Sequence, residues 1–280
     1  MIELRLKPYA SMNTAISLIS IALYLIATWI LAIGIFKADK DETEKYRKRF
    51  YLSGISALVL HAIILYQNID IAGGLNLGFY ESLSLMAWCM SMLLLLFSIR
   101  KPLEELALII FPLTAFAQVL ELVFQSQRLL PESAPLGLRI HVLLSVVAYS
   151  FLSIGAIQAI ILAFQERQIS RKTPVKIMQL PPLQLMEDLL MQIITIGFFL
   201  LSLSLVTGLG FLENIFAQHL IHKTVLSILA WIIFGLVLWG HWFRGWRGRV
   251  AVAWVLGGYA SLLLAYFGSK FVLELVLNRV

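Results

Sequence analysis

The sequence predicts an all-α membrane protein, a bundle of eight transmembrane helices with both termini outside. Of its 280 residues, 60% are hydrophobic and only 14% are charged, and the mean hydropathy is +0.87. A soluble domain needs more polar surface than this to cover its globule. The apolar residues also gather in eight runs of roughly 20 residues or more, the length that crosses about 30 Å of hydrocarbon. The whole chain, residues 1–280, is expected to form a single membrane domain.

The first run follows a short polar lead-in and is too long for the core of a signal peptide. Basic residues, glycines and prolines end the later runs, as in the segments RKP, ERQISRKTPVKIMQLPP and RGWRGR. The loops between the runs are short, so any chemistry is expected within the bundle or at its faces. The predicted spans are residues 12–36, 50–68, 80–99, 103–124, 136–164, 189–209, 222–243 and 250–276.

Lys and Arg are shared unequally among these loops. The loops expected inside hold 15 of the 22 basic residues, and the outer segments hold 7. Because basic residues are enriched in cytoplasmic loops, this asymmetry predicts the outside position of both termini. The same rule accounts for the net charge of +6, so the charge does not indicate nucleic acid.

Several classes of function have no support in the sequence. The single cysteine, Cys89, allows no intrachain disulfide, and no CxxCH motif marks a covalent haem. No Walker loop, GxGxxG, HExxH or Ser-His-Asp pattern is present. We therefore expect a protein that is not an enzyme.

Histidines are the first candidates for a site, because ionisable groups inside membrane spans are costly and often functional. His141 and His222 open two spans at the same expected outer depth, which favours a shared ligand role. His241 lies 19 residues after His222, about 28 Å along a helix, so it is expected on the cytoplasmic side. His61 lies near the middle of the second span. For His61 and His241 a neutral imidazole bonded to a neighbouring helix is an equally good interpretation.

Two aromatic segments allow a structural and a functional interpretation. In GFYESLSLMAW, Tyr80 and Trp88 are expected on nearly one helix face, with Glu81 at the mouth of the span. They fit a rim that orients a ligand, but spacing favours an interfacial belt with an acid that complements the helix dipole. RGWRGR, with Arg244, Arg247 and Arg249, is expected to anchor the topology.

Four blocks in the same order resemble the cytochrome c assembly family, the CcsA-like haem-handling membrane proteins. They are FYESLSLMAW, HVLLSVVAYSFLSIGAIQA, HKTVLSILAWIIFGLVLWGHWFRGWRGR and GGYASLLLAYFG. The resemblance is closest to the short, eight-span YpjD/HemX-like branch. His141 matches the first outer histidine of the family. The tryptophan-rich WWD segment of the family's haem-presenting members is missing, as is the second outer histidine.

The resemblance implies a bacterial inner-membrane protein that handles haem in cytochrome c assembly. We expect a non-covalent, b-type haem whose iron takes His141 and His222 as axial ligands, with Lys223 and Arg139 near its propionates. His241 and His61 are weaker candidates. The expected partners are the lipid bilayer and cytochrome c maturation or haem-synthesis proteins. Two alternatives stay open: a HemX-like regulator of haem synthesis that acts through a partner, and an accessory membrane subunit without haem.

Overall fold

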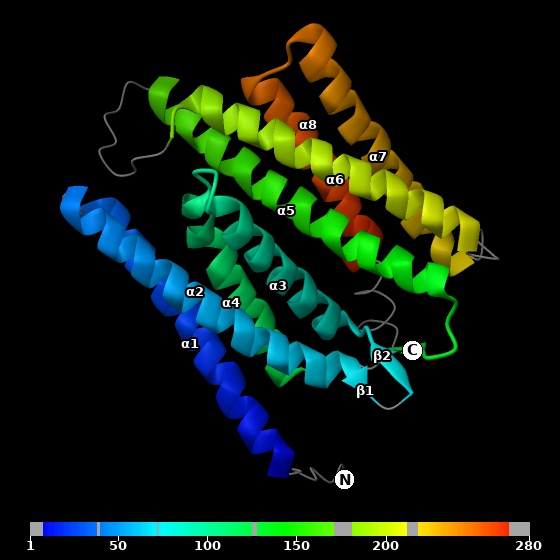
Figure 1. Ribbon diagram of the computed structural model, residues 1–280. Coiled ribbons are helices and arrows are strands. Elements are labelled where there is room, and N and C mark those ends of the chain that lie inside the picture. The colour runs from blue at the N-terminus through cyan, green and yellow to red at the C-terminus, as the bar shows by residue number, and fades with distance from the viewer. Residues whose placement is uncertain are drawn as a thin grey trace. The chain divides into compact units, whose positions relative to one another are not determined.

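A computed structural model describes the chain over residues 8–37, 40–71, 73–124, 128–170, 181–211 and 218–268. Within these residues, eight helices are long and apolar enough to cross a membrane. The structure therefore confirms an all-α, polytopic helix bundle (Figure 1). The side of the membrane on which the termini lie stays a prediction.

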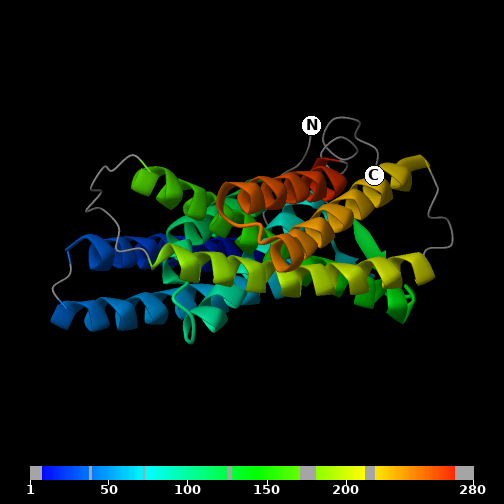
Figure 2. The ribbon, with the colours of Figure 1, turned by 90° about the horizontal axis from the view of Figure 1, so that it is seen from above.

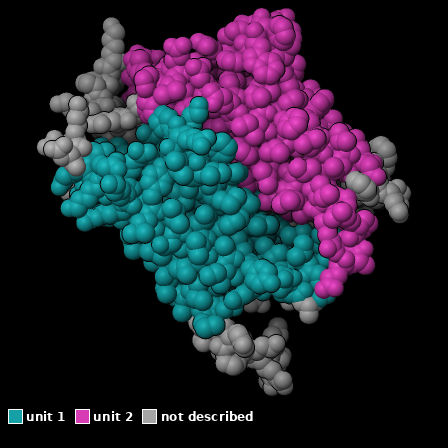
Figure 3. Space-filling model, viewed as in Figure 1, with its two compact units in different colours: residues 1–130 teal, residues 131–280 magenta. Residues whose placement is uncertain are grey.

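The chain divides into two compact units, Met1–Leu130 and Pro131–Val280 (Figure 3). Each unit contains four of the described membrane helices. Neither a linker nor a change of composition marks this division in the sequence.

Unit 1 is built from four helices that pack mainly through aromatic and aliphatic side chains. Helix α1 packs on α2 and α4, and α3 packs on α4 and α2 (Figure 1). Its largest fully buried side chains include Tyr24, Phe50, Phe111 and Leu94. The helices are α1 (Pro8–Lys37), α2 (Lys40–Ile69), α3 (Phe79–Ser98) and α4 (Ala107–Val123), with the 3-10 turn η1 (Glu104–Leu106) before α4.

A small antiparallel sheet lies beyond the end of α2 and was not expected from the sequence. Strands β1 (Asp70–Ile71) and β2 (Gly74–Asn76) form a hairpin whose turn includes Gly73, with φ 101°. Strand β3 (Leu129–Pro131) completes the sheet, in the order β1-β2-β3. The Asn76 side-chain oxygen accepts hydrogen bonds from the backbone N–H groups of Gly78 and Arg128, at 3.2 and 3.0 Å. It thus ties the hairpin to the segment that follows α4.

Unit 2 contains α5 (Leu136–Ser170), α6 (Leu183–Phe211), α7 (Gln218–Arg244) and α8 (Gly248–Leu263), followed by the π-helical turn η2 (Leu264–Gly268). Helices α5 and α6 lie side by side (Figures 1 and 2). Glycines permit this close packing, as small residues do in membrane bundles. A Cβ atom at Gly197 would lie 2.6 Å from Leu152 Cδ2, and one at Gly155 would lie 2.7 Å from Ile194 Cδ1.

Several helices extend beyond the predicted apolar spans, whose membrane boundaries stay a prediction. Helix α2 begins ten residues before the predicted span, so the basic segment Lys40–Arg49 is helical rather than a loop. Helix α5 likewise continues to Ser170, and α6 begins at Leu183. Backbone hydrogen bonding does not stop where the side chains become polar, so hydropathy alone underestimates helix length. The predicted end of the last span, at residue 276, lies outside the described residues.

Candidate functional site

His141 is held against α6 in unit 2. It lies in the second turn of α5, and its Nδ1 is 2.8 Å from the backbone carbonyl oxygen of Ser204. Because a carbonyl can only accept, Nδ1 must carry the proton, and the lone pair is then on Nε2. The Ser145 hydroxyl, one turn further along α5, bonds the Ser204 hydroxyl at 2.7 Å. Two polar contacts therefore join α5 and α6 at this level.

The His141 ring fits against the backbone of α6 because Gly208 has no side chain. A Cβ atom there would lie 2.8 Å from His141 Cε1 and 3.1 Å from Nδ1. The ring is part-buried, and no described residue forms a hydrogen bond with its Nε2. Histidines that bind metal commonly donate the other ring N–H to a carbonyl. His141 therefore holds its proton on Nδ1 and leaves Nε2 without a hydrogen-bond partner among the described residues.

His222 lies in the second turn of α7, and its side chain is outside the described residues. Its level can be inferred from the contact between α6 and α7, where the Trp231 indole N–H donates to the Ser202 hydroxyl at 2.8 Å. Gly208, which lies against His141, is six residues after Ser202 on α6, about 9 Å along the helix. His222 is nine residues before Trp231 on α7, about 13.5 Å along that helix. The two helices run in opposite directions along the chain, so these steps go to the same end. The backbone of His222 is thus about one turn beyond the level of His141.

The two predicted propionate partners differ in their surroundings. Arg139 is exposed, and its guanidinium donates to the backbone carbonyl of Glu132, in the turn before α5. Lys223 is part-buried in α7 and has contacts of its own. Lys223 directly follows His222, and Arg139 is two residues before His141. Their role toward a propionate stays a prediction.

His61 belongs to unit 1, where both of its ring nitrogens have partners. Nε2 lies 2.9 Å from the Ser84 hydroxyl and Nδ1 lies 3.4 Å from the Tyr24 hydroxyl. The ring is fully buried. This matches the structural interpretation of His61, an imidazole bonded to neighbouring helices.

The GFYESLSLMAW segment does not place its two aromatic rings on one shared surface. Tyr80 stacks on Phe124 at the end of α4, with ring centroids 5.2 Å apart. Trp88 instead donates its indole N–H to the carbonyl of Leu58 in α2, at 2.9 Å. Glu81 is in the first turn of α3, as expected for an acid that complements the helix dipole, but it is buried rather than at an open mouth.

His241, in the last turn of α7, contacts the RGWRGR turn that joins α7 to α8. Nδ1 of His241 lies 3.1 Å from the carbonyl oxygen of Trp246, and the Trp246 N–H donates to Gly240 at 3.0 Å. The Trp246 ring stacks on Trp254 of α8, with centroids 5.6 Å apart. These contacts fold the turn back on the helix ends, so His241 has a structural partner there.

The arginines of the same turn make ion pairs that the sequence did not reveal. Arg249 lies 3.4 Å from Glu166 of α5, and Arg247 lies 4.0 Å from Glu187 of α6. Glu187 also accepts the backbone N–H of Gly248 at 2.9 Å. The turn therefore ties α5 and α6 to α8, in addition to any effect on topology.

Sequence reasoning missed the residues around His141, namely Ser145, Ser204 and Gly208. Serine and glycine are common in membrane helices. Ser145 is one helical turn from His141, but nothing in the sequence marks Ser204 and Gly208, more than 60 residues away, as its neighbours. Among the described residues, no group of three or more His, Cys, Asp or Glu side chains is placed to hold a metal ion.

Comparison with known proteins gives a consistent result. A family model described as "Cytochrome C assembly protein" matches residues 51–277. Inner membrane protein YpjD of Escherichia coli (strain K12) is 31% identical over 262 residues, which cover 93% of this chain and 98% of that protein. Cytochrome c biogenesis protein CcsA of Chlamydomonas reinhardtii is 24% identical over 236 residues, which cover 80% of this chain and 65% of that protein. No solved structure gives a significant match.

Proposed function

Because the chain belongs to the cytochrome C assembly protein family, we propose that it binds and handles haem for cytochrome assembly. It is a multi-pass protein of a bacterial inner membrane, with eight described helices able to span the bilayer. The proposed cargo is a non-covalent, b-type haem. No enzymatic step is proposed, because the haem is carried rather than transformed.

The observation that carries the proposal is the orientation of His141. Its Nδ1–H is committed to the Ser204 carbonyl, so Nε2 presents the lone pair that haem iron needs. His222, about one turn beyond this level on α7, is the proposed second axial ligand. An apolar macrocycle suits a site between membrane helices, and Lys223 and Arg139 are the proposed cations for its propionates.

The test is an absorption spectrum of the full-length protein, purified in detergent and incubated with haem, in the oxidised and reduced states. His141→Ala and His222→Ala should each shift or abolish the Soret band. His61→Ala and His241→Ala serve as controls and should leave the band in place, because these rings have structural partners. Lys223→Ala should weaken haem binding without changing the band position, because it removes a charge and no iron ligand.

Two results would contradict the proposal. A wild-type haem spectrum in the double variant lacking His141 and His222 would place the ligands elsewhere. A wild-type protein that stays colourless with added haem, yet copurifies with a soluble haem-synthesis enzyme, would favour the HemX-like regulator.

A further inference from the structure

Unit 1 contains a group of buried polar side chains that the haem proposal does not use. They come from all four helices and replace the apolar side chains expected inside a membrane bundle. Each of them is at most 5% exposed. They are Tyr24 of α1, His61 of α2, Glu81, Ser84 and Ser91 of α3, and Thr114, Gln118 and Glu121 of α4.

Several of these side chains contact one another. Glu121 accepts a hydrogen bond from the Asn68 amide at 2.8 Å. In the same unit the Ser84 hydroxyl lies 2.9 Å from His61 Nε2, and His61 Nδ1 lies 3.4 Å from the Tyr24 hydroxyl. A hydroxyl, an imidazole and a phenol therefore follow one another, and each has an exchangeable proton.

Two further hydroxyl groups lie toward the middle of the unit. The Ser91 hydroxyl lies 2.7 Å from that of Thr114. Thr114 in turn donates to the backbone of its own helix and of α3.

Glu121 is the unusual member, because its charge would have no counterion. Among the described residues no Lys or Arg makes an ion pair with it, and its Oε2 atom has no hydrogen-bond partner. The titratable side chain that approaches it is another acid, Glu81 of α3. One turn away on α4, both amide atoms of Gln118 are buried without partners. An unpaired carboxylate in such surroundings costs several kcal/mol, roughly, whereas the neutral acid does not.

An apolar barrier lies beside these polar groups, on the side away from the strands. The Phe50 and Phe111 rings stack with centroids 5.6 Å apart, and Phe111 also contacts the Tyr24 ring at 5.2 Å. Along α3, Ser91 and Ser98 are separated by two turns, about 10.5 Å, which include the buried Leu94 and Leu95.

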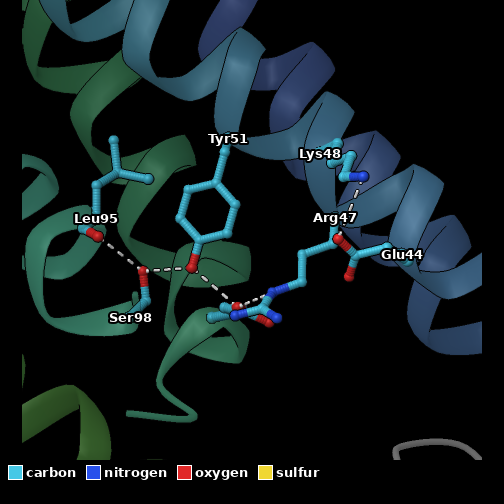
Figure 4. A network of polar contacts seen from close by, with 7 residues as sticks. Glu44, Arg47, Lys48, Tyr51, Leu95 and Ser98 are labelled. Atoms are coloured by element: carbon cyan, nitrogen blue, oxygen red, sulfur yellow. Dashed lines mark hydrogen bonds and ion pairs between the residues drawn. The ribbon is translucent and has the colours of Figure 1, made fainter. Parts of the chain in front are cut away.

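A second polar network begins beyond this barrier. There the Tyr51 hydroxyl bonds Ser98 at 3.0 Å and Glu104 at 2.9 Å, and Glu104 pairs with Arg47 at 2.7 Å (Figure 4). Unlike Glu121, Glu104 thus has a cation. The two networks contain similar residue types but only one contains an acid without a counterion.

We propose that Glu121 is a proton-binding site embedded in the membrane, filled and emptied from the strand end of unit 1. Asn68, half-buried and two residues before β1, marks the entry. Ser84, His61 and Tyr24 form a hydrogen-bonded group in the same unit. The apolar Phe50–Phe111 stack lies on the side away from the strands, so the site stores a proton and does not conduct it across the unit. The ligand is a proton and not a metal ion.

Carbodiimide labelling tests the proposal, since dicyclohexylcarbodiimide reacts with protonated carboxyl groups in apolar surroundings. The full-length protein in detergent is labelled over a range of pH, and the modified peptides are identified by mass spectrometry. Glu121 should be modified, and the extent should fall as the pH rises. Glu104, paired with Arg47, is the internal control and should stay unmodified. Failure to label Glu121 at any pH would overturn the proposal, and so would protection of Glu121 by sodium at fixed pH, which would indicate a cation site.

Infrared difference spectroscopy gives an independent measurement. The C=O stretch of a protonated carboxylic acid should appear in the wild-type protein and vanish in Glu121→Gln, which preserves the shape and neutral charge of the side chain. Glu105→Gln, in the turn η1 before α4, is the matched control and should retain the Glu121 band. A band that persists in Glu121→Gln would contradict the assignment. None of these measurements requires haem.

Discussion

The imidazole of His141 lies directly against the backbone of Gly208, where any Cβ atom would come within 2.8 Å of its Cε1. A glycine on α6 thus sets the position of a histidine on α5. Two contacts with α6 fix the orientation of the ring. One ring edge lies against Gly208, and Nδ1 donates to the Ser204 carbonyl, so Nε2 points in a fixed direction.

Gly208→Ala should therefore weaken haem binding. The added methyl group displaces the ring and breaks its hydrogen bond to Ser204, which is worth about 1 kcal/mol and corresponds to about a fivefold rise in the dissociation constant. A haem titration followed at the Soret band measures this dissociation constant. Gly210→Ala is the matched control, because nothing lies within 4 Å of a Cβ atom at that position. Equal effects of the two substitutions would show that the contact has no role in binding.

Close packing of α5 on α6 is the subject of a second prediction. A Cβ atom at Gly197 would lie 2.6 Å from Leu152 Cδ2, so Gly197→Ala overpacks the interface and should destabilise the protein by about 1–3 kcal/mol. Thermal unfolding in detergent measures the loss. Leu152→Ala, combined with Gly197→Ala, should recover part of it by removing the clashing atoms. Gly257→Ala, which meets nothing within 4 Å, controls for the general effect of replacing a helix glycine. An additive double variant would contradict the predicted clash.

Hydropathy and the basic loops were sufficient to predict the eight helices, because a membrane span must be apolar and of a certain length. They could not locate the ends of α2 and α5, where polar residues continue the helix. They also gave no sign of the β1–β2 hairpin, whose strands have two and three residues.

The candidate site was predictable only in part. A histidine at a span boundary is conspicuous, so His141 could be selected from the sequence. Its partners, Ser204 and Gly208, could not, because they depend on how α5 and α6 are aligned. The same holds for Glu121, a single acid in an apolar run. Only its neighbours from α2 and α3 reveal that it lies among buried polar side chains.

The arginines of the RGWRGR turn carry a third prediction. Replacing Arg244, Arg247 and Arg249 with Ala should impair insertion or orientation more than haem binding, because basic residues beside a span fix its orientation. The structure adds a loss of stability, since Arg249 and Arg247 pair with Glu166 and Glu187. Membrane fractionation, site-specific labelling and the Soret band of the recovered protein measure the three effects. Normal insertion with loss of haem would show that the turn belongs to the haem site.

The last prediction concerns the orientation of the chain, and α2 is the element that tests it most directly. From Lys45 to Ile69, the last residue of α2, the chain covers about 36 Å of helix, which exceeds the hydrocarbon thickness of about 30 Å, and Asp70 follows directly. The side chains of Lys45 and Asp70 are exposed, whereas Asn76 on β2 is buried and holds the hairpin, so it is a poor labelling position.

Cysteines are placed at these two positions one at a time, in a Cys89→Ala background that removes the natural thiol. An impermeant thiol reagent added to intact spheroplasts should label Asp70→Cys and leave Lys45→Cys unlabelled until the membrane is opened. The reason is the basic segment around Lys45, which is expected to stay in the cytoplasm. The opposite pattern would invert the topology and place both termini inside. Labelling of both positions from outside would mean that α2 does not cross the membrane.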